Sequence, residues 1–134
     1  MVRRRRRYPE EPDIVFHHAD YAGRFGERSR SFDLLISQWA GPVGQRCRRY
    51  LRPGGILLAN DSHGDAGLAN LDPAYRLVAV VNRPGRRHRL SDEELDSYFI
   101  QRGGRRLTRR RLEELGKGVR YARSAGMYVF RRVR

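Results

Sequence analysis

Apolar residues along the chain gather in five short runs, which polar or glycine-rich segments separate. The runs contain β-branched, aliphatic and aromatic residues, so each predicts a β-strand. The continuous Leu-Leu-Ile centre of the second run is typical of a strand that is buried on both faces, as in a parallel sheet. The five predicted strands span residues 13–18, 32–37, 56–59, 76–81 and 127–130.

Helical signals fill two of the intervals between these strands. Apolar residues recur with the spacing of one helix face from Val43 to Leu51, and Pro53-Gly54-Gly55 ends this predicted helix. Ser91-Asp92-Glu93-Glu94 matches a capping box and predicts a second helix that ends near Ile100. A third helix is predicted over residues 108–115. The segment between the third and fourth strands is rich in Gly, Asp and Asn and predicts a loop.

Strands that alternate with helices predict an α/β fold in a single domain, which suits a chain of 134 residues. The second and third strands are linked through one helix, and this link is the signature of a right-handed parallel crossover. A mostly parallel sheet is therefore expected. The chain divides into a basic arm (1–12), a sheet core (13–82), a basic helical insert (83–126) and a final strand (127–134).

The charge of the chain is distributed unevenly. Of the formal net charge of +14, residues 83–134 contribute +10, from 16 basic and 6 acidic residues. A basic surface of this kind binds phosphate backbones, so nucleic acid is one predicted partner. Lys117 is the sole lysine, and a bias this strong toward arginine is equally typical of GC-rich coding. Both interpretations of the charge stay open.

Cysteine usage and hydropathy limit where the protein acts. Cys47 is the only cysteine, which excludes an internal disulfide, and its place among helically spaced apolar residues favours burial over a nucleophilic role. No apolar run approaches the roughly 18 residues of a membrane span. No apolar region follows the N-terminal arginines to make a signal peptide. A cytoplasmic protein without membrane partners is expected.

Polar side chains follow the first three predicted strands. Ligands bind outside the carboxyl ends of the strands in an open parallel sheet, so these side chains predict a small-molecule cleft. A metal site is chemically possible for the imidazoles and carboxylates, but no HExxH or CxxC spacing supports one, and none is predicted. The side chains are His17, His18, Asp20 and Tyr21, then Ser37, Gln38 and Trp39, then Asn60, Asp61, Ser62, His63 and Asp65.

Three stretches together, FDLLIS, the helix ending in LRPGG, and ILLAND, resemble the second half of class I S-adenosylmethionine-dependent methyltransferases. The resemblance covers residues 8–82 and the final strand. It implies a partial Rossmann-like fold whose last strand inserts antiparallel, with S-adenosylmethionine as cofactor and a small molecule as methyl acceptor.

The resemblance also implies roles for the residues at the strand ends. Asp20 and Tyr21 are expected beside the adenine of the cofactor, and Asn60 and Asp61 on the substrate side. His18 or His63 is the candidate base. Cofactor contact is further expected from Ser37, Gln38 and Trp39. From the residues alone, Asp20 is equally suited to cap a turn, and Trp39 to cover the edge of the core.

The chain departs from the family pattern at one place. The first strand of the family, its glycine-rich loop and its ribose-binding acid precede the part that this sequence matches, so strand 32–37 is expected to have an unpaired edge. We expect the chain to form a homodimer through that edge or to bind a complementing chain. The alternatives are a small basic α/β protein that binds nucleic acid without catalysis, and a remnant that has lost activity.

Overall fold

The computed structural model describes residue 7, residues 11–105 and residues 107–134. Five strands form one open mixed sheet in the order β1-β2-β5-β3-β4, so the predicted α/β class is confirmed. Most of the predicted basic arm, residues 1–12, lies outside the described residues. The strands are β1 (Phe32–Ser37), β2 (Leu51–Ala59), β3 (Tyr75–Asn82), β4 (Arg89–Ser91) and β5 (Met127–Arg132).

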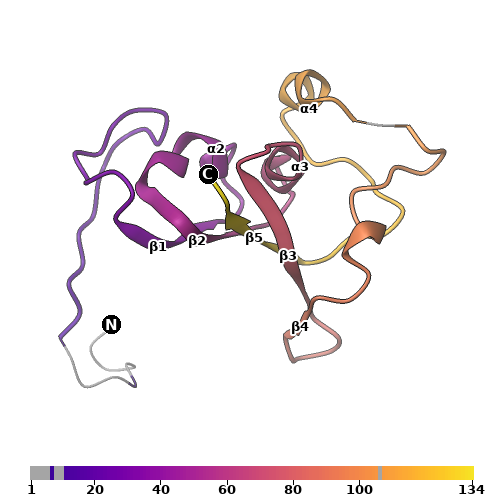
Figure 1. Cartoon of the computed structure of the whole chain (residues 1–134), viewed down its shortest axis with the longest axis horizontal. Helices are drawn as coiled ribbons and strands as arrows, with labels where there is room; N and C mark the ends of the chain where they lie inside the picture. Colours follow the sequence, from indigo (N-terminus) through magenta and orange to yellow (C-terminus); the bar gives the residue numbers. More distant parts are fainter. Residues whose placement is uncertain (1–6, 8–10, 106) are drawn as a thin grey trace.

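The helices lie together on one side of this sheet (Figure 1). They are α2 (Val43–Arg46), α3 (Asp65–Asn70) and α4 (Arg109–Leu115), with two 3-10 turns, η1 (Arg48–Tyr50) and η2 (Leu95–Ser97). Within the described part of the chain, no helix has the length and apolar character needed to cross a bilayer.

The expected mostly parallel sheet is wrong. The β1–β2 pairing is parallel, but β5 pairs antiparallel with both β2 and β3, and β4 pairs antiparallel with β3. The reason is the position of β5. It inserts between β2 and β3, which run in the same direction, and separates them. The antiparallel insertion of the final strand was expected and is confirmed.

The predicted helix before strand β2 is shorter than expected. It is reduced to α2 and the turn η1, and Leu51 already belongs to β2. Pro53-Gly54-Gly55 therefore lies inside the strand, where the register with β1 jumps from the pair Phe32–Leu51 to the pair Leu34–Ile56. Gly54 has a φ of 82°, a conformation that glycine adopts readily, so the motif makes a bulge and not a helix end.

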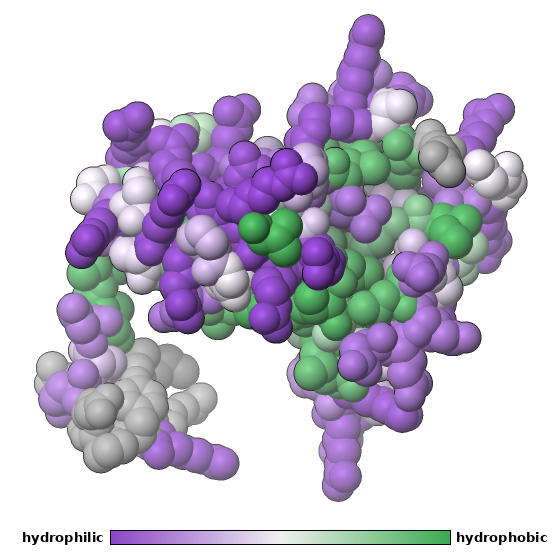
Figure 2. Space-filling model, in the orientation of Figure 1, coloured by the Kyte–Doolittle hydropathy of each residue, from purple (hydrophilic) through white to green (hydrophobic). Residues whose placement is uncertain are grey.

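The strand predicted at residues 13–18 is absent. This segment has no strand partner among the described residues, and Ile14, Val15 and Phe16 are 64%, 65% and 85% exposed. Figure 2 shows this stretch as apolar surface at the left of the molecule. A β-strand requires a neighbouring strand for its backbone hydrogen bonds, and a run of β-branched residues cannot supply one.

Two further predictions fail between β2 and α4. The helix expected over residues 91–100 is replaced by the end of β4 and the turn η2; Ser91 Oγ accepts a hydrogen bond from the Glu93 N–H at 3.2 Å, and Glu94 has a φ of 50°. Conversely, α3 occupies part of the segment that was expected to be a loop. The helix expected at 108–115 is confirmed as α4, with the Thr108 hydroxyl capping the Arg111 N–H at 3.2 Å.

The core lies between the sheet and the helices. Leu57, Ala59 and Phe130 have no exposed surface, and they pack with Ala66 and Ala69 of α3. Cys47 is 5% exposed, which agrees with the expected burial, and that burial raises the pKa of its thiol. The hydrophobic effect therefore acts mainly on one face of the sheet.

The opposite face of the sheet is open at its β1 edge. β1 is the outermost strand, so the expected unpaired edge is confirmed. Leu34 and Ile36 are 51% and 56% exposed, whereas Leu35 packs against the core and Ser37 is buried. The expected burial of β1 on both faces is wrong, because the described residues cover only one of them.

Candidate functional site

A cleft of about 370 Å³ lies at the carboxyl ends of β1 and β2. One wall of the cleft is formed by residues that directly follow the two strands. The other wall is formed by the segment that leads into β5. The Gly118 N–H donates to the Ser62 carbonyl oxygen at 3.3 Å and ties the two walls together. The lining residues are Trp39, Asn60, Asp61, Ser62, Gly118, Val119, Arg120, Tyr121, Ser124, Ala125, Gly126 and Tyr128.

Asn60 organises the turn at the end of β1. Its Oδ1 accepts hydrogen bonds from the Trp39 N–H at 3.3 Å and from Ser62 Oγ at 3.0 Å. Its own N–H donates to the Ser37 carbonyl oxygen at 3.2 Å. Trp39 has a φ of 49° and its side chain is largely exposed. The buried Asn60 therefore holds the strained Trp39 backbone at the rim of the cleft.

Asp61 is the titratable group with the most unusual environment in the cleft. Its Oδ1 accepts a hydrogen bond from the Gly67 N–H of α3 at 2.7 Å. Its Oδ2 is buried and has no hydrogen-bond partner among the described residues. Burial raises the pKa of Asp61 from 3.8 to about 6, against the opposing effect of the Gly67 and Val119 N–H groups, and the charge of Asp65 raises it further.

Two glycines allow the chain to pack this closely around Asp61. A Cβ atom on Gly118 would overlap the Asp61 carbonyl oxygen and lie 3.0 Å from Oδ2. A Cβ atom on Gly67 would lie 2.8 Å from the Tyr121 hydroxyl and 3.4 Å from Asp61 Oδ1. Tyr121 and Asp61 are therefore neighbours across Gly67. Burial, and then the charge of Asp61, raises the pKa of Tyr121.

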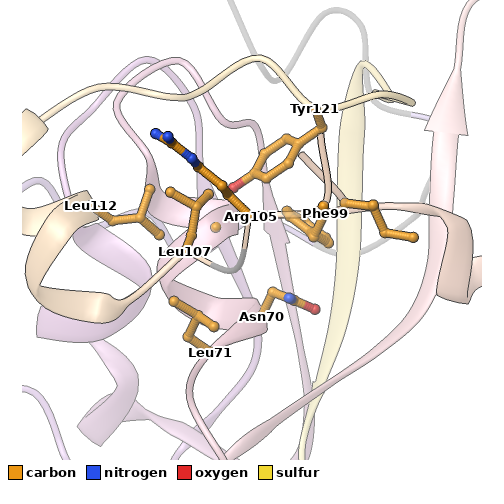
Figure 3. Close-up of a pocket in the computed structure, with 10 residues that line it drawn as sticks. Asn70, Leu71, Phe99, Arg105, Leu107, Leu112 and Tyr121 are labelled. Atoms are coloured by element: carbon orange, nitrogen blue, oxygen red, sulfur yellow. The ribbon is translucent and has the colours of Figure 1, made fainter. Parts of the chain in front are cut away.

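A second cavity, of about 310 Å³, shares Tyr121 with the cleft. Figure 3 shows Tyr121 beside Arg105, above the apolar side chains of Leu107, Leu112 and Leu71. Phe99 also lines this cavity, and its ring centroid lies 5.1 Å from that of Tyr121 in an edge-on arrangement. Tyr121 therefore has apolar neighbours in this cavity and the carboxyl group of Asp61 as its neighbour in the cleft.

Three of the residues predicted at the site meet in the cleft, namely Trp39, Asn60 and Asp61. Ser37 does not join them: it is 2% exposed, and its Oγ donates to Asp65 Oδ2 at 2.5 Å. That bond links the end of β1 to α3 within a buried polar group. Gln38 is directed elsewhere, with its Nε2 2.9 Å from the Met127 sulfur.

The remaining predicted residues lie apart from the cleft. Asp20 accepts a hydrogen bond from the Ala22 N–H at 2.8 Å and caps a turn, and Tyr21 places its hydroxyl against Gly41. His63 lines a different cavity, with its Nδ1 3.0 Å from Ser62 Oγ, and His18 is exposed. The described residues include no group of three or more His, Cys, Asp or Glu arranged to hold a metal ion.

These positions bear on the expected cofactor. Of the five residues expected to contact S-adenosylmethionine, one lines the cleft, one is buried in a hydrogen bond to Asp65, and one caps a turn. The residues of this chain therefore do not fit the cofactor as a site of their own.

Local sequence patterns did not indicate the residues of the second wall of the cleft. Gly118 and Tyr121 come from the segment before β5, which the pattern assigns to a helical insert, and Tyr128 lies in β5 itself. This segment reaches the cleft because β5 pairs with β2, with Ala59 opposite Tyr128. A residue's distance from the cleft thus depends on strand order, which local patterns do not specify. The glycines at 118 and 126 were the one local sign of close packing.

Comparison with known proteins identifies no relative: no family description, no curated protein and no solved structure matches this chain. The fold and the cleft define an α/β protein with an open mixed sheet and a small polar cleft at the strand ends.

Proposed function

We propose that this chain forms the second half of an S-adenosylmethionine-dependent methyltransferase domain with a small-molecule acceptor. In this proposal a first half, on the same or another polypeptide, completes a Rossmann-like sheet and supplies most of the cofactor site. The observation that carries the proposal is the position of β1, which has the sequence of a central strand and occupies the edge of the sheet.

The edge position supports a missing neighbour. FDLLIS has Phe32, Leu34 and Ile36 on one face, and its continuous Leu-Leu-Ile centre adds Leu35 on the other, which is typical of strands flanked by other strands and covered on both sides. Among the described residues, no strand lies on one side of β1, and its alternate residues Leu34 and Ile36 are exposed. A strand beside β1 and a layer against its open face would satisfy both features of the sequence.

The remaining topology agrees with the same proposal. The final strand inserts antiparallel beside β2, as the resemblance implied, and the cleft lies at the carboxyl ends of the two strands that carry FDLLIS and ILLAND. In the proposed domain, Trp39 lies where cofactor and acceptor meet. Asn60 and Asp61 face the acceptor, which matches their place in the cleft.

Calorimetry with S-adenosylmethionine tests this proposal in two steps. The chain alone is expected to give no heat at millimolar cofactor, because it does not gather the cofactor residues. The first half of a class I methyltransferase, fused before residue 11, is expected to restore binding. Leu34→Lys in the fusion should abolish that binding, because it places a charge at the new strand interface, whereas Leu90→Lys on the far edge strand β4 should not.

Two results would contradict the proposal. Tight cofactor binding by the chain alone would show that the site is complete without a second half. A fusion that folds cooperatively, with β1 protected from hydrogen exchange, but does not bind the cofactor would show that β1 is not the family's central strand.

A second candidate function is nucleic-acid binding by the basic C-terminal part, and the exposure of its arginines favours it. Twelve arginines and Lys117 are exposed between residues 83 and 134, three of the arginines in the turn between β3 and β4. Affinity for duplex or single-stranded nucleic acid should fall steeply as salt rises, because such contacts release counterions. Binding that is insensitive to salt would exclude this function.

A further inference from the structure

Acidic side chains in this basic protein are commonly matched by a cation. The chain has 29 basic and 15 acidic residues, so partners are abundant. Asp72, for example, is 7% exposed at its side chain and contacts both Arg48 and Arg109. Other carboxylates in ion pairs are Glu27, Asp33, Glu94, Glu113 and Glu114.

Asp61 differs from these carboxylates. Its pKa is set by burial, by two backbone N–H groups and by the like charge of Asp65, and no basic side chain is among these influences. Its Oδ2 is buried without a hydrogen-bond partner in the described part of the chain. A carboxyl group in this state is costly for the fold, since a buried charge is normally paired.

The surroundings of Asp61 favour a cation over other ligands. Three aromatic residues line the cleft around it, namely Trp39, which is 73% exposed, and Tyr121 and Tyr128, which are buried and pack against Phe99. The face of the exposed Trp39 ring attracts an ammonium group, and a carboxylate in the same cleft adds an ionic contact. Arg120, which is exposed, is the one basic side chain among the lining residues.

We propose that Asp61 binds the protonated amine of a small molecule, held in the cleft against the exposed ring of Trp39. The cleft volume of about 370 Å³ suits a ligand of this class. The proposal rests on the proposed function for one point only, the ligand's role as methyl acceptor. Binding of the amine itself requires neither the cofactor nor a second half of the domain.

The proposed site is pH-dependent in a defined direction. Asp61, with a pKa of about 6, is mainly ionised at neutral pH and binds the ammonium group; it becomes protonated in mild acid and releases it. The titratable and charged groups around it are Asp65 of α3, Tyr121 and Tyr128 at the walls, and Arg120 at the rim. The tyrosines stay neutral over this range because burial raises the pKa of each.

Benzylamine is a suitable probe, because it joins one aromatic ring to one ammonium group. Titrated into the full chain and followed by amide NMR, it is expected to shift Trp39 and Val119 at about pH 8 and to bind at least about tenfold more weakly at about pH 5. Asp61→Asn should weaken binding by about tenfold or more at the higher pH. Asp20→Asn removes an exposed carboxylate elsewhere and should change nothing.

Benzyl alcohol, the neutral probe of the same shape, separates charge recognition from simple apolar binding. It is expected to bind at least about tenfold more weakly than benzylamine. Equal binding of the two probes, equal binding by the wild type and Asp61→Asn, or shifts confined to residues outside the cleft would each overturn the proposal. So would the absence of benzylamine binding at millimolar concentration.

A second measurement on the wild type guards against a variant that does not fold. Saturating benzylamine should lower the pKa of the Asp61 carboxyl, read by carbon NMR, by about one unit for a tenfold preference for the charged form. An unchanged pKa would overturn the proposal. Loss of cofactor binding in the fusion experiment would leave these results unaffected, so the amine site and the methyltransferase function can fail separately.

Discussion

The two faces of the sheet differ in what covers them, although both present apolar side chains. On the helix-covered face, Leu57 and Phe130 have no exposed surface. On the open face, Leu34 and Ile36 of β1 are more than half exposed. The same sheet therefore contains residues that stabilise the fold by burial and residues of similar character that stabilise it little.

The difference shows which face of the sheet this chain covers with its own residues. The covered face needs α2, α3 and α4, all of which the chain contains, and its core closes around them. The open face would need a layer that no described residue supplies. An apolar face with this exposure is a typical docking surface. The contrast can be tested by changing matched residues on the two faces.

The largest expected effect comes from a matched pair of leucines on neighbouring strands. Leu57→Ala should lower the free energy of unfolding by about 3 to 4 kcal/mol, because it leaves a cavity in the covered core. Leu34→Ala should lower it by less than about 1 kcal/mol, because half of its side chain already contacts water. Urea unfolding of the isolated chain measures both. Equal losses would show that the open face is covered in solution.

The features that the sequence predicted well are those fixed by neighbours along the chain. β1 was placed at its observed bounds, and Asp61 was placed at a strand end, because both follow from a local apolar run. α3 was not predicted, since Asp65 through Ala69 are buried by contacts with distant strands and show no amphipathic pattern. The strand expected at 13–18 fails for the converse reason: its composition is suitable, but it pairs with no strand among the described residues.

The site was predictable only as far as strand ends define it. Asn60 and Asp61 follow ILLA directly and needed only the direction of β2. Tyr121 and Tyr128 depend on the insertion of β5 between β2 and β3, which is a property of the whole sheet. The pKa of Asp61 likewise depends on the segment that covers it, and composition alone does not indicate that segment.

A second expected effect compares a carboxylate under the covered face with one on the open edge. The folded-state pKa of Asp61, about 6, lies above its unfolded value, so ionisation opposes folding. Stability should therefore fall as pH rises from about 4 to about 6, and Asp61→Asn should raise it by about 2 kcal/mol above that window and remove the slope. Thermal or urea unfolding across pH checks this.

Asp33→Asn provides the matched control for that experiment. Asp33 lies on β1 with an exposed side chain that pairs with Arg52, so its removal should change stability by less than about 0.5 kcal/mol at any pH. A destabilising effect of Asp61→Asn at about pH 8 would contradict the assigned burial of an uncompensated carboxyl group.

A smaller effect tests how far the packing on the helix-covered face of the sheet depends on α4. Thr108 caps the first turn of this helix, and Leu112 of the same helix is 1% exposed. Thr108→Ala should lower the free energy of unfolding by about 1 kcal/mol. Thr108→Ser, which keeps the hydroxyl, should retain most of the free energy of unfolding of the wild type. A loss in both variants would point to the methyl group of Thr108 and not to the cap.

The smallest expected change in stability accompanies a change in assembly. Ile36→Lys places a charge on the open face at the unpaired edge of β1, where it displaces a side chain that is already 56% exposed, so the free energy of unfolding should change by less than about 0.5 kcal/mol. The wild type is expected to self-associate through this edge, because an unpaired apolar strand offers free backbone groups to a second copy. The lysine should suppress that association, since two copies would each have to bury it, and light scattering over a concentration series measures the difference. Leu90→Lys, on the opposite edge strand, should leave association unchanged.

A wild type that stays monomeric at high concentration would mean that the open edge of β1 does not attract a second copy, and that its natural neighbour is a different polypeptide segment.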